Sequence, residues 1–148
     1  MSRETLKNAS RIVVKLGTRV LTESLKQPYL AQMKQLVAQM ASLRNAGKEI
    51  VLVTSGAVGA GMGVLGFDKR PPELAAQQAC AAVGQSRLMA TYEKLFSDFS
   101  LNVAQVLLTH SDLQHHERHL NARNTLVTLL RHGVVPIINE NDAVSFTE

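Results

Sequence analysis

Four short apolar runs alternate along the chain with longer segments in which apolar residues recur every three or four positions. The runs are residues 11–16, 50–53, 103–108 and 134–138, and their length and β-branched composition are typical of buried strands. The fourth run contains Pro136, which has no amide hydrogen to donate to a neighbouring strand. We therefore expect that run at a sheet edge or at a bulge.

The segments between these runs have the period of helices. Apolar side chains at three- and four-residue spacing predict a helix over residues 29–46, which Gly47 would end. Residues 74–99 and 120–131 also read as helices, and Gly84 in the first of them marks a bend or a close contact. Connections this long join parallel strands by right-handed crossovers. The pattern predicts an α/β fold, a three-layer α/β/α sandwich with a mostly parallel sheet.

Composition narrows the class of protein. The chain has 148 residues, 45% of them hydrophobic, which suffices for a core of its own. A single cysteine, Cys80, excludes an intramolecular disulfide framework, and no apolar run reaches the length of a membrane span. We expect no membrane association and a cytoplasmic location. The net charge of +4 arises from basic residues that are scattered singly among few aromatics, so we expect no nucleic-acid partner.

Polar residues cluster where three of the predicted strands end. In parallel α/β sheets, ligands bind outside the carboxyl ends of the strands, so the fold would bring these clusters to one edge. That convergence is the main physical indication of a site. The clusters are Lys15 with Gly17 and Thr18; Ser55, Gly56 and Ala57; and Asn139, Asn141 and Asp142.

Two of the clusters have the chemistry of an anion site. Lys15, in an otherwise apolar strand, either extends its ammonium group to solvent or binds an anion. Gly17 would let a ligand approach the backbone, and Thr18 offers a hydroxyl and an amide. The glycine-rich residues 54–66 are either a phosphate or carboxylate cradle of backbone amides or a tight turn packed on the sheet.

The third cluster is suited to a cation. Amide and carboxylate groups at residues 139–142 can hold a ligand ammonium by charge-assisted hydrogen bonds, and the alternative is an Asx-type turn.

The other motifs in the sequence are weaker indications of a site. Residues 61–66 match G-x-G-x-x-G but begin seven residues after the strand ends and lack the acidic partner of a dinucleotide site. No Walker sequence is present. The histidines fit no metal motif and fit a solvated helix start better; they are His110, His115, His116 and His119.

Six segments, in this order and spacing between residues 11 and 144, closely resemble the glutamate 5-kinase branch of the amino-acid kinase family. They read VVKLGTRVLT, IVLVTSGAVGAG, QQACAAVGQSRLM, QVLLT, LNARNTL and GVVPIINENDAV. The resemblance implies phosphoryl transfer from ATP, with Mg²⁺ as its cofactor, to the γ-carboxylate of L-glutamate. The product would be L-glutamyl 5-phosphate, in the first step of proline biosynthesis.

The resemblance also implies residue roles. Lys15 would be the catalytic residue that contacts the transferring phosphate, and Asp142 would face the ammonium of glutamate. The other phosphate-binding residues would be Gly17, Thr18 and Gly56. The substrate-binding residues would be Ser55, Gly56, Ala57, Asn139, Asn141 and Asp142.

Three further expectations follow from the resemblance. The family's kinase domain continues beyond residue 148 into a nucleotide-binding half, and many members add a PUA domain. We therefore expect residues 1–148 to be the N-terminal part of such a domain, inactive alone. Proline would compete at or near the glutamate site, and small residues over 75–84 together with the family habit predict a homo-oligomer. The alternatives are another acidic-substrate kinase of the family and a non-catalytic module that binds glutamate or proline.

Overall fold

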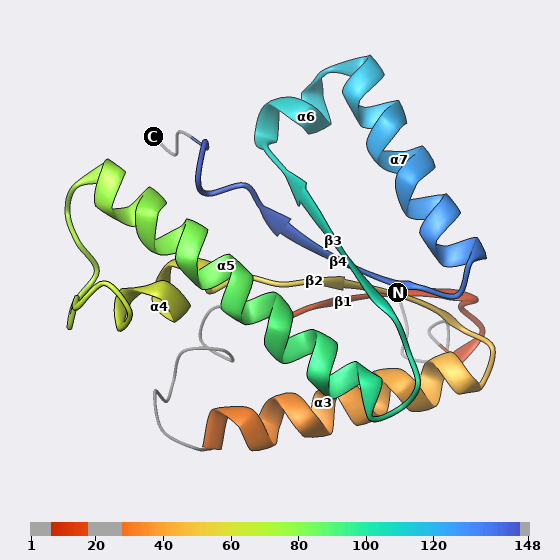
Figure 1. Cartoon of the computed structure of the whole chain (residues 1–148). Helices are drawn as coiled ribbons and strands as arrows, with labels where there is room; N and C mark the ends of the chain where they lie inside the picture. Colours follow the sequence, from red (N-terminus) through yellow and green to blue (C-terminus); the bar gives the residue numbers. More distant parts are fainter. Residues whose placement is uncertain (1–6, 18–27, 146–148) are drawn as a thin grey trace.

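The structure, a computed structural model, describes residues 7–17 and 28–145. Four strands form one sheet in the order β1-β2-β4-β3, and every neighbouring pair is parallel (Figure 1). This confirms the predicted α/β class and the parallel sheet. The strands are β1 Arg11–Lys15, β2 Glu49–Val53, β3 Val103–Leu108 and β4 Val135–Glu140.

Helices cover the sheet from two sides. The crossovers from β1 to β2 and from β2 to β3 run across the sheet in one direction, whereas the crossover from β3 to β4 steps back. Because crossovers are right-handed, the helix that joins β3 to β4 lies on the opposite face of the sheet. In Figure 1 the strands run between α7 above and α3 below. The helices are α3 Pro28–Asn45, α4 Ala57–Met62, α5 Leu74–Ser97, α6 His110–Gln114 and α7 His116–Arg131.

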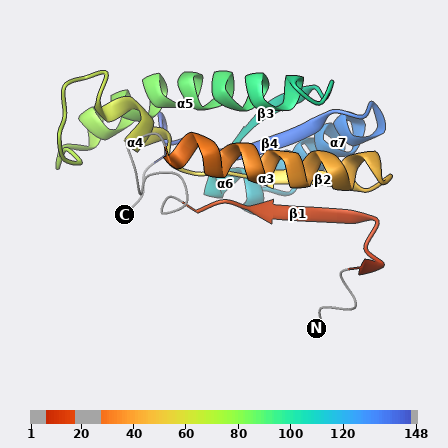
Figure 2. The same ribbon diagram turned by 90° about the horizontal axis from the view of Figure 1, so that it is seen from below.

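The main core lies between the sheet and the pair α3 and α5, which pack side by side (Figure 2). Its helical members recur at the three- and four-residue spacing that predicted these helices. None of the described helices is long and apolar enough to cross a lipid bilayer. The buried core comprises Leu16, Met33, Val37, Met40, Ile50, Leu52, Leu88, Tyr92, Leu95, Phe96, Val135 and Ile137.

The expectation that residues 11–16 form a buried strand was wrong for one face of β1. Ile12 and Val14 are half-buried against the core, but Arg11, Val13 and Lys15 are exposed, Val13 by 62%. The reason is the place of β1 at the edge of the described sheet. There α3 packs on one face, while α7 packs over β4 and leaves the other face of β1 open to solvent.

The expectation for Pro136 was also wrong, because β4 is an inner strand between β2 and β3. Val135 donates its amide to Asn102 on the β3 side, and successive amides of a strand alternate between its neighbours. The nitrogen of Pro136 therefore faces β2. Registered pairs with β2 begin only at Ile137, so the proline lies just outside that ladder and costs it no hydrogen bond.

Candidate functional site

Hydrogen bonds beyond the strands tie the end of β1 to the end of β2. Leu16 donates its amide to the carbonyl of Val53 at 2.8 Å, and the Ser55 hydroxyl donates to the carbonyl of Leu16 at 3.1 Å. The two strands therefore stay in register past their last ladder pair. This brings the cluster that begins at Lys15 beside the cluster that begins at Ser55.

The ends of β2, β4 and β3 are joined in the same way. Thr54 donates its amide to Ile138 at 2.8 Å, and Asn141 donates its amide to Leu108 at 3.0 Å. The carboxyl ends of all four strands thus form one continuous edge. The structure brings the three predicted clusters together there, except Thr18, which lies outside the described residues.

At the end of β1 the backbone is accessible. Lys15 is exposed, so both interpretations of the sequence stay open: an ammonium group extended to solvent, or one that binds an anion. Apart from its chain neighbours, no atom of the described residues lies within 4 Å of the place where a Cβ at Gly17 would stand. The described residues leave room for a ligand beside the backbone at Gly17, and its role in phosphate binding stays a prediction.

The turn from β2 into α4 requires a glycine. Gly56 has φ +91° and ψ +10°, the left-handed conformation that side chains disfavour. Its carbonyl accepts the amide of Ala60 at 2.9 Å, which starts the helix, and Ala57 beside it is buried. The glycine-rich segment thus begins as a tight turn at the carboxyl edge of the sheet, and its use as a phosphate or carboxylate cradle stays a prediction.

The small helix α4 packs directly on α5 through two glycines. A Cβ added at Gly61 would stand 1.9 Å from the carbonyl oxygen of Cys80, and one added at Gly84 would stand 1.7 Å from that of Ala57. The close contact expected at Gly84 is confirmed, as is the burial of Cys80. The G-x-G-x-x-G match places its first glycine in this helix contact. Small residues expected to mediate self-association here contact α4 of the same chain, and the homo-oligomer stays a prediction.

Asn139 belongs to a hydrogen-bond network that sequence reasoning missed, buried at Asn139 and Gln85 and exposed at Gln105. It is 4% exposed, and its side-chain amide donates to the Oε1 of Gln85 at 2.8 Å. Gln85 donates in turn to the Oε1 of Gln105 at 2.9 Å, and the Oδ1 of Asn139 accepts the amide of Glu140 at 2.9 Å. The available signal was a glutamine at a core-facing position of α5 and another in the apolar run of β3.

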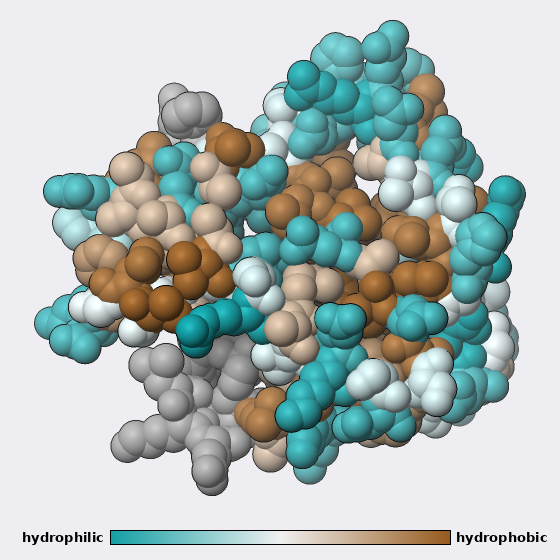
Figure 3. Space-filling model, viewed as in Figure 1, coloured by the Kyte–Doolittle hydropathy of each residue, from teal (hydrophilic) through white to brown (hydrophobic). Residues whose placement is uncertain are grey.

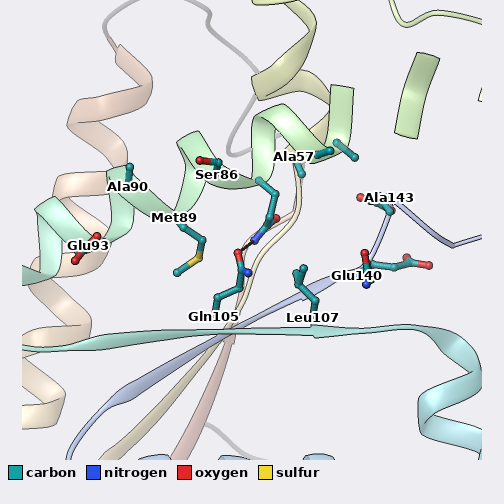
Figure 4. A pocket seen from close by; sticks show the side chains of 14 residues that line it. Ala57, Ser86, Met89, Ala90, Glu93, Gln105, Leu107, Glu140 and Ala143 are labelled. Atoms are coloured by element: carbon teal, nitrogen blue, oxygen red, sulfur yellow. Dashed lines mark hydrogen bonds between the residues drawn. The ribbon is translucent and has the colours of Figure 1, made fainter. Parts of the chain in front are cut away.

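A cleft of about 550 Å³ opens between α5, β3 and the segment that follows β4. In Figure 4, Met89 and Glu93 of α5 lie across from Gln105 and Leu107 of β3. In the space-filling view, hydrophobic surface gathers over the strands between α5 and α7 (Figure 3). Of the predicted site residues, three line the cleft: Ala57, Asn141 and Asp142.

The charge of this cleft suits a cationic group. Its described lining includes the carboxylates of Glu93, Glu140 and Asp142 and neither a lysine nor an arginine. Burial, and then the neighbouring charge of Glu140, raise the pKa of Asp142, while Arg70 opposes the rise. A ligand ammonium would relieve this repulsion.

The four histidines lie apart from this site, on α6, on α7 and, for His115, at the residue between them, and all four are exposed. His116 begins α7, which is consistent with the solvated helix start that the sequence favoured, although α7 starts earlier than residue 120. Among the described residues, no group of three His, Cys, Asp or Glu side chains is placed to hold a metal ion.

Comparison with known proteins identifies proteins that are similar to this chain. A sequence profile described as "Amino acid kinase family" matches residues 10–148. The chain is 54% identical to the glutamate 5-kinase of Moorella thermoacetica over 146 residues, 99% of this chain and 39% of that protein. It is 49% identical to the enzyme of the same name from Symbiobacterium thermophilum, covering 99% of this chain and 56% of the relative. The chain therefore spans about two fifths to just over half the length of these relatives.

A solved structure resembles the fold. A carbamate kinase from Giardia lamblia, bound to AMP-PNP, superposes with a TM-score of 0.59 over 95% of this chain and 63% of that chain. The two sequences are only 12% identical, so this similarity concerns the fold alone.

Proposed function

The chain belongs to the amino acid kinase family, and from that premise we propose that it supplies the glutamate and phosphoryl site of a glutamate 5-kinase. The reaction transfers the γ-phosphoryl group of ATP to the γ-carboxylate of L-glutamate and yields L-glutamyl 5-phosphate. This is the first step of proline biosynthesis. The relatives that carry the name glutamate 5-kinase, at 49% and 54% identity, support the proposal.

The chemistry demands little beyond positioning and charge. A glutamate side chain has a reference pKa of about 4.3, so the nucleophile is already ionised and needs no general base. The protein must align the carboxylate with the phosphoryl group and neutralise the charge that spreads over it. Lys15 supplies the cation in this proposal, and the backbone at Gly17 and Gly56, together with Thr18, supplies further donors.

The amino-acid end of glutamate would lie in the cleft. Asp142, with Glu140 beside it, would face the ammonium, and Asn141 and Ala57 line the same space. Ser55 would contact the substrate from the neighbouring turn. Asn139 stays in the proposed set, and the network that buries it supports a role in holding the end of β4. The observation that carries the proposal is that the cationic strand end at Lys15 and this acidic cleft lie along the same carboxyl edge of the parallel sheet.

ATP and Mg²⁺ complete the proposal as partners. The described residues hold no cluster of metal ligands, so we assign no side chain of this chain to the magnesium ion, which would arrive with ATP. Proline, as the pathway product, would compete with glutamate at the cleft. A cytoplasmic location and self-association remain predictions.

The test uses the chain and a hybrid enzyme. In the hybrid, this chain replaces the matching part of the Moorella thermoacetica relative, to which it is 54% identical over 146 residues. We expect ATP- and glutamate-dependent hydroxamate formation by the hybrid, with the parent enzyme as the control, and heat of binding from L-glutamate with the chain itself. A hybrid that folds and phosphorylates another acidic substrate but not glutamate would contradict the proposal. Amino-acid binding by the chain, with no activity in a folded hybrid, would favour a binding module.

A further inference from the structure

A buried pair of hydroxyl groups joins α5 to the end of β2. The Thr54 hydroxyl lies 2.8 Å from that of Tyr92, and the two residues are 5% and 0% exposed. The same hydroxyl oxygen of Thr54 lies 3.4 Å from the carbonyl oxygen of Ser55, to which the hydroxyl can donate. These contacts lie one peptide before the Gly56 turn.

The three groups form one consistent chain of donors and acceptors. Each hydroxyl has a single hydrogen, so Thr54 can donate to Ser55 only while Tyr92 donates to Thr54. A hydroxyl group in a core is costly unless it is hydrogen-bonded, and a valine would fill the same space as Thr54 without a hydroxyl. The hydroxyl at this position therefore serves a contact that packing alone does not require.

The carbonyl held by this chain determines where an amide points. The peptide between Ser55 and Gly56 is planar and trans, so its carbonyl oxygen and its amide hydrogen point in opposite directions. A Ser55 carbonyl turned towards the buried hydroxyls turns the Gly56 amide away from the core. Gly56 itself follows the carboxyl end of β2, at the edge of the sheet where β1 and β2 end.

We propose, on the basis of the proposed function, that Tyr92 and Thr54 are positioning residues that aim the Gly56 amide at the phosphoryl group. Neither side chain reaches the substrate. Tyr92 acts through Thr54, and Thr54 acts through the Ser55 carbonyl. The Ser55 hydroxyl anchors the turn to Leu16, and the hydroxyl chain adds a separate constraint on the Ser55 carbonyl.

The test removes each hydroxyl and keeps the shape. In the 148-residue chain, Tyr92→Phe and Thr54→Val should each shift the NMR signal of the Gly56 amide and speed its hydrogen exchange. The double variant should equal the larger single effect, because both residues act through one chain. Thr54→Ser keeps the hydroxyl and should restore the signal. Thr91→Val is the matched control, since the Thr91 hydroxyl bonds to the carbonyl of Arg87 within α5.

Kinetics in the hybrid enzyme give the second readout. Loss of a donor aimed at a developing charge lowers kcat by about 10²–10³ in known cases, and a donor that is only misaimed should cost about tenfold. The KM for glutamate should change by less than about twofold. Unchanged Gly56 signals in folded Tyr92→Phe and Thr54→Val, or equal changes in Thr91→Val, would overturn the positioning role. An inactive wild-type hybrid would contradict the proposed function alone, because the Gly56 signals still decide the positioning.

Discussion

Replacing Gly84 with alanine tests how closely α4 packs on α5. The added Cβ would stand 1.7 Å from the carbonyl oxygen of Ala57 and 2.6 Å from the amide nitrogen of Gly61. Ordinary contact begins at 3.4 Å, and both partners are backbone atoms, which cannot rotate aside as a flexible side chain would. The α4 backbone must therefore retreat by about 1.7 Å.

Two opposing terms determine the magnitude. Alanine is favoured over glycine inside a helix by up to about 1 kcal/mol, whereas overpacking of a core costs about 1–3 kcal/mol. A clash with backbone belongs at the upper end, so we expect a net loss of about 2 kcal/mol in the free energy of unfolding. For a chain of this length that loss lowers Tm by about 4–8 °C.

Urea unfolding followed by circular dichroism measures the effect. The midpoint should fall by about 1 M with an unchanged m-value. Gly63→Ala is the matched control, because Gly63 has φ −63° and no other part of the described chain lies within 4 Å of its Cβ position. That variant should be as stable as the wild type or more stable. If Gly84→Ala matches Gly63→Ala in stability, the helices are not packed as described, and the reasoning fails.

Three other variants test the charged groups. Lys15→Ala in the hybrid enzyme should lower kcat by about 10²-fold or more, with little change in the KM for glutamate; an unchanged kcat with a raised KM would contradict the assigned role. Asp142→Asn should stabilise the ligand-free chain at pH 7, because a carboxyl whose pKa is raised by burial and by Glu140 opposes folding when ionised. Urea titrations should show this advantage disappearing below pH 3.8, the ordinary pKa, while calorimetry shows weaker glutamate binding; stability unchanged at pH 7 would contradict the burial of this carboxyl. Hydrogen bonds from the Thr109 hydroxyl and amide, and then Arg118, hold the pKa of Asp112 below its usual range. Its ionised form therefore favours the fold above pH 3.8, and Asp112→Asn should lower Tm by more at pH 7 than near pH 2, because the stabilisation declines as the pH falls from 3.8 through the lowered pKa; an equal loss at both pH values would count against this helix cap.

The sequence by itself determined the elements and where their ends converge. Apolar runs and helical periods depend on neighbours a few residues away, so they predicted the four strands and the long helices α3, α5 and α7, with a shifted start for α7. The short helices α4 and α6 were not predicted. The same local pattern located the clusters at residues 15–17, 55–57 and 139–142. Because all the strands are parallel, their carboxyl ends necessarily share one edge.

Only the tertiary structure decided the strand order and the partners of buried polar groups. The exposure of Val13 follows from the edge position of β1, and Pro136 is tolerated because the ladder with β2 begins one residue later. Tyr92 is a core residue of α5, and its hydroxyl group contacts that of Thr54, which lies 38 residues away in the chain. Such contacts join residues far apart in the chain, and no local spacing specifies which distant group a buried donor will reach.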